Sequence, residues 1–216
     1  MKTIFTAIFG PYDDLKEPQV ITPGWKYVCY TDQNLKSKVW EIVRRPMLPE
    51  GNIRTARFYK IMFHRHVETE FSMWIDASFV INTDLNEWWK RFKEPVTVIR
   101  HPVRDCVYQE AKICIVRKKD SDVLLSKQAR DYRLSGLPRN SGLISSGILM
   151  RKMNQAAIDL CDSWYQQVQL YSSRDQVAFA YASWRHPVHH AIDWDYRNNN
   201  EFLHVPHFHN RKPHTL

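Results

Sequence analysis

The spacing of apolar residues along the chain predicts alternating strands and helices. Short apolar runs bounded by turn residues indicate strands, and longer runs with apolar positions three and four residues apart indicate helices. The predicted strands cover residues 3–9, 25–32, 38–45, 71–81, 96–101 and 141–152, and the predicted helices cover 53–67, 85–93, 107–119, 154–171 and 175–186. This order is typical of an α/β protein with a mostly parallel central sheet flanked by helices. We predict no element in the charged stretch up to about residue 134 or in the tail, 192–216.

The stretch SMWIDASFVI, residues 72–81, places a charge inside an apolar strand. Alternation puts Met73 on one face of the strand and Trp74, Asp76 and Ser78 on the other. A buried carboxylate without a partner is costly, so Asp76 needs one. A short acidic motif at the end of a buried strand suits a divalent cation that bridges two phosphates, with Ser78 as the weaker ligand.

Other polar residues follow the ends of predicted strands, where ligands of open α/β sheets bind. The segment from Thr6 to Tyr12 closes the first strand, and the Tyr12 ring suits either stacking on a nucleobase or ordinary packing. Asp32 closes the next strand, where it suits either a hydrogen bond from a base imide or the capping of a turn.

Basic residues gather on one arc of the predicted helix 53–67. Arg54, Arg57, Lys60 and His64 recur at helical spacing. Such a cluster suits a pyrophosphate, and a solvated basic face is the alternative.

Two segments near the end of the chain offer further ligands. Asp175 and Gln176 open a predicted helix, whose N-terminus favours negative charge. In HVPHFHNRKPH, residues His204, His207 and His209 suit an imidazole ligand, or they form a surface cluster.

Composition limits the class of protein but does not decide between the alternative roles of these residues. With 216 residues, 44% of them apolar, we expect one domain over 1–216, with the tail 192–216 folded back over the active site. The net charge of +8 favours an acidic partner or gives a plain basic surface. Four cysteines without a CxxC pair predict buried free thiols in a reducing compartment, and no apolar run approaches a membrane span, so we expect a cytoplasmic protein. Neither GxGxxG nor GxxxxGK[ST] occurs, so the usual dinucleotide and P-loop readings lose their support.

Three motifs in a fixed order resemble a known family. RTARFYKI (54–61), MWIDAS (73–78) and SRDQ (173–176) are similar to motifs of the glycosyltransferase-like domain once catalogued as domain of unknown function 616, and the likeness covers about residues 3–185. That domain is similar in turn to the retaining glycosyltransferases of family 8. The resemblance implies a GT-A-like (Rossmann-like) fold and a nucleotide-sugar donor bound over the sheet.

The resemblance also implies roles for individual residues. Asp76 and Ser78 match an Asp-x-Asp manganese motif in which Ser78 replaces a carboxylate, so Mn²⁺ or Mg²⁺ is expected but more weakly held. His207, with His209 as a fallback, matches a histidine ligand near the C-terminus. Asp175 and Gln176 match a catalytic pair beneath the donor sugar. The other donor-binding residues it implies, with those named from the strand ends and the basic helix, are Thr6, Ala7, Phe9, Tyr12, Asp32, Arg54, Arg57, Lys60 and Ser146.

The expected activity is transfer of a sugar from a nucleoside-diphosphate sugar to a hydroxyl acceptor, with retention implied by the resemblance. Candidate acceptor-binding residues are His101, Arg104 and Glu110. The acceptor is a glycan or a modified base in DNA, and for DNA the segment NEWWKRFK would contact bases and phosphates unless it packs as an ordinary amphipathic helix. A non-catalytic nucleic-acid-binding protein on the same fold and a metal-dependent hydrolase are the alternatives.

Overall fold

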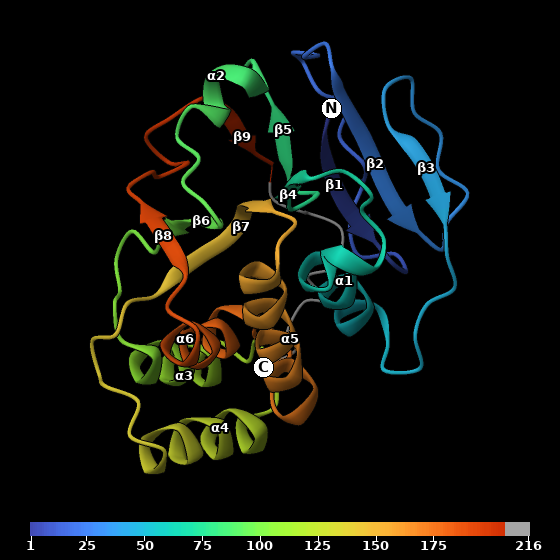
Figure 1. Ribbon diagram of the computed structural model, residues 1–216. Helices are drawn as coiled ribbons and strands as arrows, with labels where there is room; N and C mark the ends of the chain where they lie inside the picture. The colour runs from blue at the N-terminus through green and yellow to red at the C-terminus, as the bar shows by residue number, and fades with distance from the viewer. Residues whose placement is uncertain (206–216) are drawn as a thin grey trace.

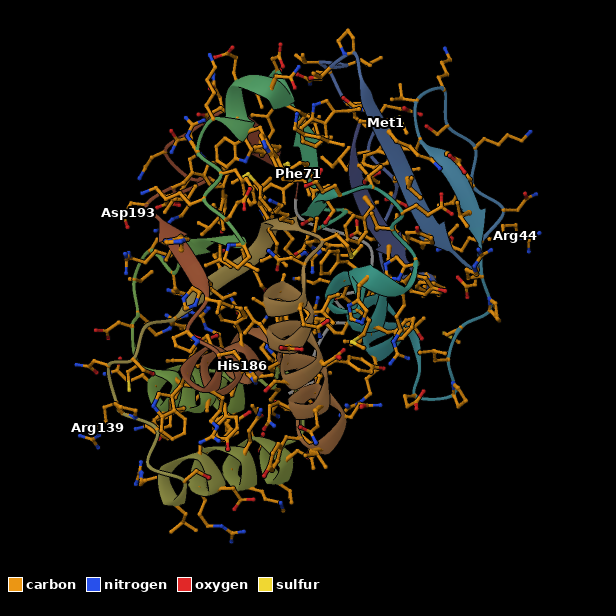
Figure 2. All side chains as sticks on the ribbon, viewed as in Figure 1. Met1, Arg44, Phe71, Arg139, His186 and Asp193 are labelled. Carbon is orange, nitrogen blue, oxygen red and sulfur yellow. The ribbon has the colours of Figure 1, made fainter. Side chains whose placement is uncertain are left out.

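A seven-stranded sheet runs through the middle of the computed structural model, which describes residues 1–205 (Figure 1). The strands lie in the order β3-β2-β1-β4-β7-β6-β8, and only β7 runs antiparallel to its neighbours. Their bounds are β1 (Lys2–Ile8), β2 (Trp25–Thr31), β3 (Glu41–Arg44), β4 (Phe71–Ile75), β6 (Val96–Arg100), β7 (Ile144–Lys152) and β8 (His189–Ile192). Arg44, the last residue of β3, and Asp193, directly after β8, are labelled at the two ends of the sheet in Figure 2. The predicted α/β class is confirmed, and the sheet is compatible with a Rossmann-like GT-A fold.

Each face of the sheet has its own apolar core. Helices α1 (Asn52–Ile61), α5 (Gln155–Leu170) and α6 (Asp175–Arg185) cover one face, where Phe5 and Trp74 are buried. The other face, which buries Ile4 and Met73, is covered by α2 (Leu85–Trp89) and by a small sheet of β5 (Phe79–Ile81) and β9 (Phe202–His204). The two sets alternate along each strand because successive side chains point to opposite faces.

A helical hairpin of α3 (Val107–Val116) and α4 (Asp122–Leu134) packs against α6. Figure 1 shows α4 as the outermost element of this layer, with α3 and α6 between it and the sheet. The sequence did not predict α4, because its buried positions are Leu125, Gln128 and Tyr132, of which one is polar. Too few apolar residues mark its inner face for a helical period to stand out.

Two predicted elements are wrong in extent. The single strand predicted over 71–81 is interrupted after Ile75, where the Phe79 N–H donates to the Asp76 carbonyl (3.0 Å) and closes a turn. The predicted helix 53–67 ends at Ile61 and is followed by a 3-10 turn, η1 (Phe63–Arg65). The short strands β8 and β9 were also not predicted.

The described part of the C-terminal segment packs against α2 and β5. Trp194 and Phe202 both meet the ring of Trp88 edge to face, and Trp88 is fully buried. Trp89 packs edge to face on Trp25. The NEWWKRFK segment therefore packs as an amphipathic helix, and its tryptophan rings are not displayed for nucleobases.

The structure also bears on the cysteines, on membrane-spanning helices and on two candidate histidine ligands. All four cysteines are free and buried, as predicted. Among residues 1–205, no helix is both long and apolar enough to cross a membrane. The candidate ligands His207 and His209 lie outside the described residues.

Candidate active site

Polar residues that follow four different strands meet at one edge of the sheet. β1, β2, β4 and β6 all point the same way, so their carboxyl ends lie along the same edge. Tyr12, Asp32, Asp76 and His101 come just after those ends. This is the edge at which open α/β sheets bind their ligands.

Lys60 is the centre of a group of charges at this edge. It lies in the last turn of α1 and is fully buried. Its Nζ is 2.7 Å from Asp175 Oδ2 and 3.2 Å from Asp76 Oδ1, and Arg57 Nη1 is 3.5 Å from the same Asp175 oxygen. We call Arg57, Lys60, Asp76 and Asp175 the charge cluster. Its two cations and two carboxylates compensate one another, which is the condition for burying charge.

Asp175 is the most enclosed member of the charge cluster, with only 1% of the residue exposed. Besides Lys60, it accepts hydrogen bonds from the Ser146 hydroxyl (2.9 Å) and from the Gln176 N–H (3.1 Å). Burial opposes its ionisation, but the charges of Arg57, Lys60 and Arg174 outweigh that effect and hold the pKa of Asp175 below its ordinary value. In this arrangement Asp175 holds the two cations of α1 in place.

The low pKa of Asp175 predicts an acid-sensitive contribution to stability. Because the unfolded chain binds this proton more readily than the folded one, the contribution is complete above about pH 4 and is lost as the pH falls further. We expect Asp175→Asn to lower the free energy of unfolding at neutral pH and to flatten its loss below about pH 4. Urea unfolding at a series of pH values measures both. Asp193→Asn, which alters an exposed carboxylate, is the control, and an acid loss in Asp175→Asn equal to that of the wild type would refute the assignment.

Asp76 lies in the turn between β4 and β5 and remains partly open, with 34% of its side chain exposed. Its Oδ1 accepts from Lys60 and from the Trp74 indole N–H (2.7 Å). Lys60 therefore supplies part of the positive charge that Asp76 needs, and the predicted bound cation would add to it. No described residue donates a hydrogen bond to Oδ2. This oxygen lies near Gly147, and a Cβ atom added at position 147 would stand 2.9 Å from the Phe79 ring.

Of the carboxylates in the charge cluster, Asp76 offers a divalent cation one oxygen, Oδ2, that accepts no hydrogen bond from a described residue. Within residues 1–205, no group of three His, Cys, Asp or Glu side chains could hold a metal ion. Ser78 lies two residues on, and its carbonyl accepts the Val205 N–H (2.7 Å). One carboxylate combined with phosphate oxygens is a usual way of holding Mg²⁺, so the set fits a cation that arrives with a diphosphate.

The turn after β1 is fixed by residues that follow β2. The Gly10 N–H donates to Asp32 Oδ1 (2.9 Å), and the Gln33 side chain donates to the Gly10 carbonyl (2.7 Å). Gly10 has φ +59°, which favours glycine. Tyr12 leaves this turn with 59% exposure, so its ring is available for stacking. Asp32 thus caps the turn with one oxygen, which is one of the two roles that the sequence predicted for it.

Several predicted donor-binding residues make other contacts. Arg54 donates to the carbonyls of Val168 and Tyr171 at the end of α5, and His64 pairs with Asp162 on the same helix (3.3 Å). The prediction that both belong to one basic face with Lys60 is therefore wrong, because Arg54 contacts the end of α5 and His64 lies beyond α1, in η1.

The β1 residues predicted to bind the donor are inside the fold. Thr6, Ala7 and Phe9 are 1%, 8% and 1% exposed, and Phe9 stacks on the Tyr59 ring. Their side chains pack inside the protein and are not exposed to a ligand.

The candidate acceptor residues do form one group, at the end of β6. Arg104 Nε is 2.6 Å from Glu110 Oε2, and His101 Nδ1 accepts the N–H groups of Val103 and Arg104. Burial and the Arg104 charge lower the pKa of His101, so its ring is neutral at pH 7. Glu110 is 4% exposed, so within this group it orients Arg104.

Sequence reasoning missed the residues that support the charge cluster. Burial alone would lower the pKa of the Arg174 guanidinium, but the negative charges of Asp175 and Glu110 raise it. Arg174 also donates to Gln176 Oε1 (3.3 Å). Asp120 accepts two 2.6 Å hydrogen bonds from Ser173 and so fixes the residues that lead into α6. Neither residue could be identified from the sequence, because both act through contacts between segments that lie far apart along the chain.

Arg151 is a second missed residue, and here a signal existed. It is a fully buried charge in β7 that donates to the Lys60 carbonyl (2.7 Å) and lies over the Phe63 ring at 4.3 Å. Its charge meets the negative end of the α1 dipole and fixes the backbone that carries Lys60. A charged residue inside an apolar strand, the feature that drew attention to Asp76, marks Arg151 equally.

The mostly parallel α/β sheet with a charge cluster at its carboxyl edge is compatible with a glycosyltransferase-like class of protein. Residues 28–203 match the family model described as TOD1/MUCI70, glycosyltransferase-like domain. This match covers most of the chain, which therefore belongs to that family, and the resemblance drawn from the three motifs is confirmed. No curated protein matches the chain.

Proposed function

We propose that this protein is a nucleotide-sugar-dependent glycosyltransferase that transfers its sugar to a hydroxyl group with retention of configuration. The observation that carries the proposal is the charge cluster at the carboxyl edge, with the exposed Tyr12 ring and the open side of Asp76 beside it. Family membership supports a sugar donor and an acceptor. The relation to family 8 and the nucleotide are part of the proposal.

The donor diphosphate would contact the accessible members of the cluster. Arg57, whose side chain is 18% exposed, supplies positive charge to the leaving diphosphate, while buried Lys60 holds the carboxylates that face it. Such fixed charge is commonly the largest catalytic contribution. Mn²⁺ or Mg²⁺ held by Asp76, with Ser78 nearby, would add Lewis-acid stabilisation of the same leaving group. Tyr12 would stack on the base, and the second oxygen of Asp32 would accept from it.

The residues proposed to lie beneath the sugar have different roles. Asp175 is enclosed by Lys60, Arg57 and Ser146, so it and Ser146 act as positioning residues. Gln176 is only half-buried, and its side chain donates to the Ile144 carbonyl (2.9 Å) at the start of β7. Of the two predicted catalytic residues, we therefore assign the contact with the donor sugar to Gln176, because it is less enclosed than Asp175.

A glycan acceptor is favoured over a DNA base. Trp88 is buried and Trp89 packs on Trp25, so the aromatic surface that a nucleic-acid partner needs is not displayed. His101 and Arg104 would contact the acceptor at the end of β6, oriented by Glu110.

Thermal-shift screening against nucleoside diphosphates and nucleotide-sugars, with and without Mn²⁺, tests this function. We expect at least one nucleotide-sugar to raise the melting temperature of the wild type, and expect Arg57→Gln to lose most of that shift. Arg65→Gln, which changes an exposed arginine of η1, should keep it.

Assays of DNA binding and of hydrolysis separate the alternatives. Salt-sensitive DNA binding without any response to nucleotides would favour a binding protein on the same fold. Hydrolytic turnover without a nucleotide-sugar would favour a metal-dependent hydrolase, and either result would overturn the proposal.

A further inference from the structure

The hairpin of α3 and α4 and the loop that follows it are basic. Residues 112–139 contain eight Lys and Arg residues against three Asp, a net charge of +5. Lys127 and Arg130 both pair with Asp131. Among the described residues, no carboxylate pairs with the other six, which are Lys112, Arg117, Lys118, Lys119, Arg133 and Arg139. Figure 2 labels Arg139 at the end of the molecule where α4 lies.

The same hairpin exposes large aliphatic side chains. Leu134 is 80% exposed, Val123 is 76% exposed and Val116 is 69% exposed, more than any other large apolar residue of the described chain except Met1. Burial in the protein core does not account for these three, because α3 and α4 direct Leu125 and Tyr132 inward instead. Single exposed aliphatics are ordinary, but these three all lie on one basic hairpin.

Helical spacing puts the two kinds of residue on one face of α4. Positions 123, 127, 130 and 134 recur every three or four residues, so Val123, Lys127, Arg130 and Leu134 share the outer face. Val116 ends α3, and Arg117 and Lys119 lie in the turn between α3 and α4. We call these seven residues the hairpin face.

We propose that the hairpin face binds a lipid surface that carries anionic headgroups. Basic side chains meet the headgroups, and the aliphatic side chains between them enter the boundary with the acyl chains, as in interfacial amphipathic helices. A nucleic-acid partner fits the face less well, because none of its seven residues is aromatic and bases need a stacking surface. The assignment of the face is independent of the proposed transferase activity.

The hairpin is tied to the candidate active site by buried hydrogen bonds. Asp120 accepts from Ser173, and Gln128 of α4 accepts from the Ser172 hydroxyl at 2.6 Å. Ser173 stands two residues before Asp175 of the charge cluster. Docking through the hairpin face would therefore hold the site at a fixed position over the lipid surface, which suits an acceptor carried by that surface; this last step rests on the proposed function.

Co-sedimentation with lipid vesicles tests the binding directly. The full chain should bind vesicles of phosphatidylcholine with about 30% phosphatidylserine, and it should bind pure phosphatidylcholine far more weakly. At about 500 mM NaCl the binding should be largely lost, because the headgroup charges are screened. Arg117→Gln with Lys119→Gln should lower the partition coefficient on the order of tenfold, since each basic residue near the surface counts for several-fold. Val123→Ser with Leu134→Ser should lower it several-fold.

Matched variants outside the hairpin show whether the face is specific. Lys36→Gln with Lys38→Gln removes the same charge from exposed positions before β3, and Ile21→Ser with Met47→Ser removes two exposed apolar side chains. Both pairs should bind as the wild type does. Thermal melting of every variant checks that it is folded.

Three results would overturn the proposal. The first is no binding to anionic vesicles at low salt. The second is unchanged binding by Val123→Ser with Leu134→Ser, which would mean a purely electrostatic surface for a polyanion such as a nucleic acid. The third is an equal loss in the Lys36 and Lys38 variant, which would mean that charge acts from the whole surface. A failure to find transferase activity would leave all three measurements valid.

Discussion

Lys60→Met will lower the free energy of unfolding by about 3–5 kcal/mol, the cost of breaking a buried ion pair from one side. Lys60 is fully buried and contacts Asp175, which is itself 1% exposed. The substitution leaves a carboxylate inside the protein whose remaining ion-pair partner is Arg57 at 3.5 Å, with the charge of Arg174 nearby. Urea unfolding followed by circular dichroism measures the change. Loss of sugar transfer should accompany it, because the same substitution releases Asp76.

Two further variants separate this charge effect from simple truncation. Lys90→Met changes an exposed lysine that pairs with Glu87, and should cost less than about 1 kcal/mol. Adding Asp175→Asn to Lys60→Met removes the stranded carboxylate, so the double variant should be more stable than the sum of the two single changes predicts. Strictly additive effects would show that Lys60 and Asp175 do not stabilise one another.

Asp76→Asn will reduce sugar transfer by on the order of 100-fold or more, the range seen when one fixed group that stabilises developing charge is removed. Asp76 is the partly exposed carboxylate of the charge cluster, and its Oδ2 has no hydrogen-bond donor among the described residues. The amide keeps the shape of the side chain but cannot carry the charge proposed to hold the cation. Asp76→Ala should abolish turnover in the same assay while the protein stays folded, because Lys60 keeps its contact with Asp175.

Asp162→Asn is the matched control for this prediction. It makes the same chemical change on α5, where Asp162 pairs with His64 away from the charge cluster. Transfer by this variant should match that of the wild type once a transferase assay is in hand. Wild-type turnover in Asp76→Asn would remove Asp76 from the mechanism.

Local patterns in the sequence were enough to find the core of the site. A charge in an apolar strand singled out Asp76, helical spacing singled out Arg57 and Lys60, and the start of a helix singled out Asp175. These residues meet because the ends of parallel strands and the ends of the helices beside them fall at the same edge of the sheet. The alternation predicted around Asp76 also holds, since Trp74 and Met73 are buried in the cores on opposite faces.

The remaining features depended on contacts between distant segments. Helical spacing could not show that Arg54 and His64 turn to α5, because it fixes neighbours on a helix and not what packs against it. The partner of Asp76 could not be read from its own strand, since Lys60 arrives from α1. The strand break at Asp76 escaped detection because Ala77 and Ile81 continue the apolar alternation beyond the turn.

A crystal structure of the protein with Mn²⁺ and the nucleoside diphosphate that gives the largest thermal shift tests the central claim most directly. The account predicts diphosphate oxygens within hydrogen-bond distance of Arg57, the cation on Asp76 and the base against Tyr12. A nucleotide bound elsewhere, for example in the cavity of about 760 Å³ lined by Tyr30, Arg45 and His66, with the charge cluster left untouched, would contradict it.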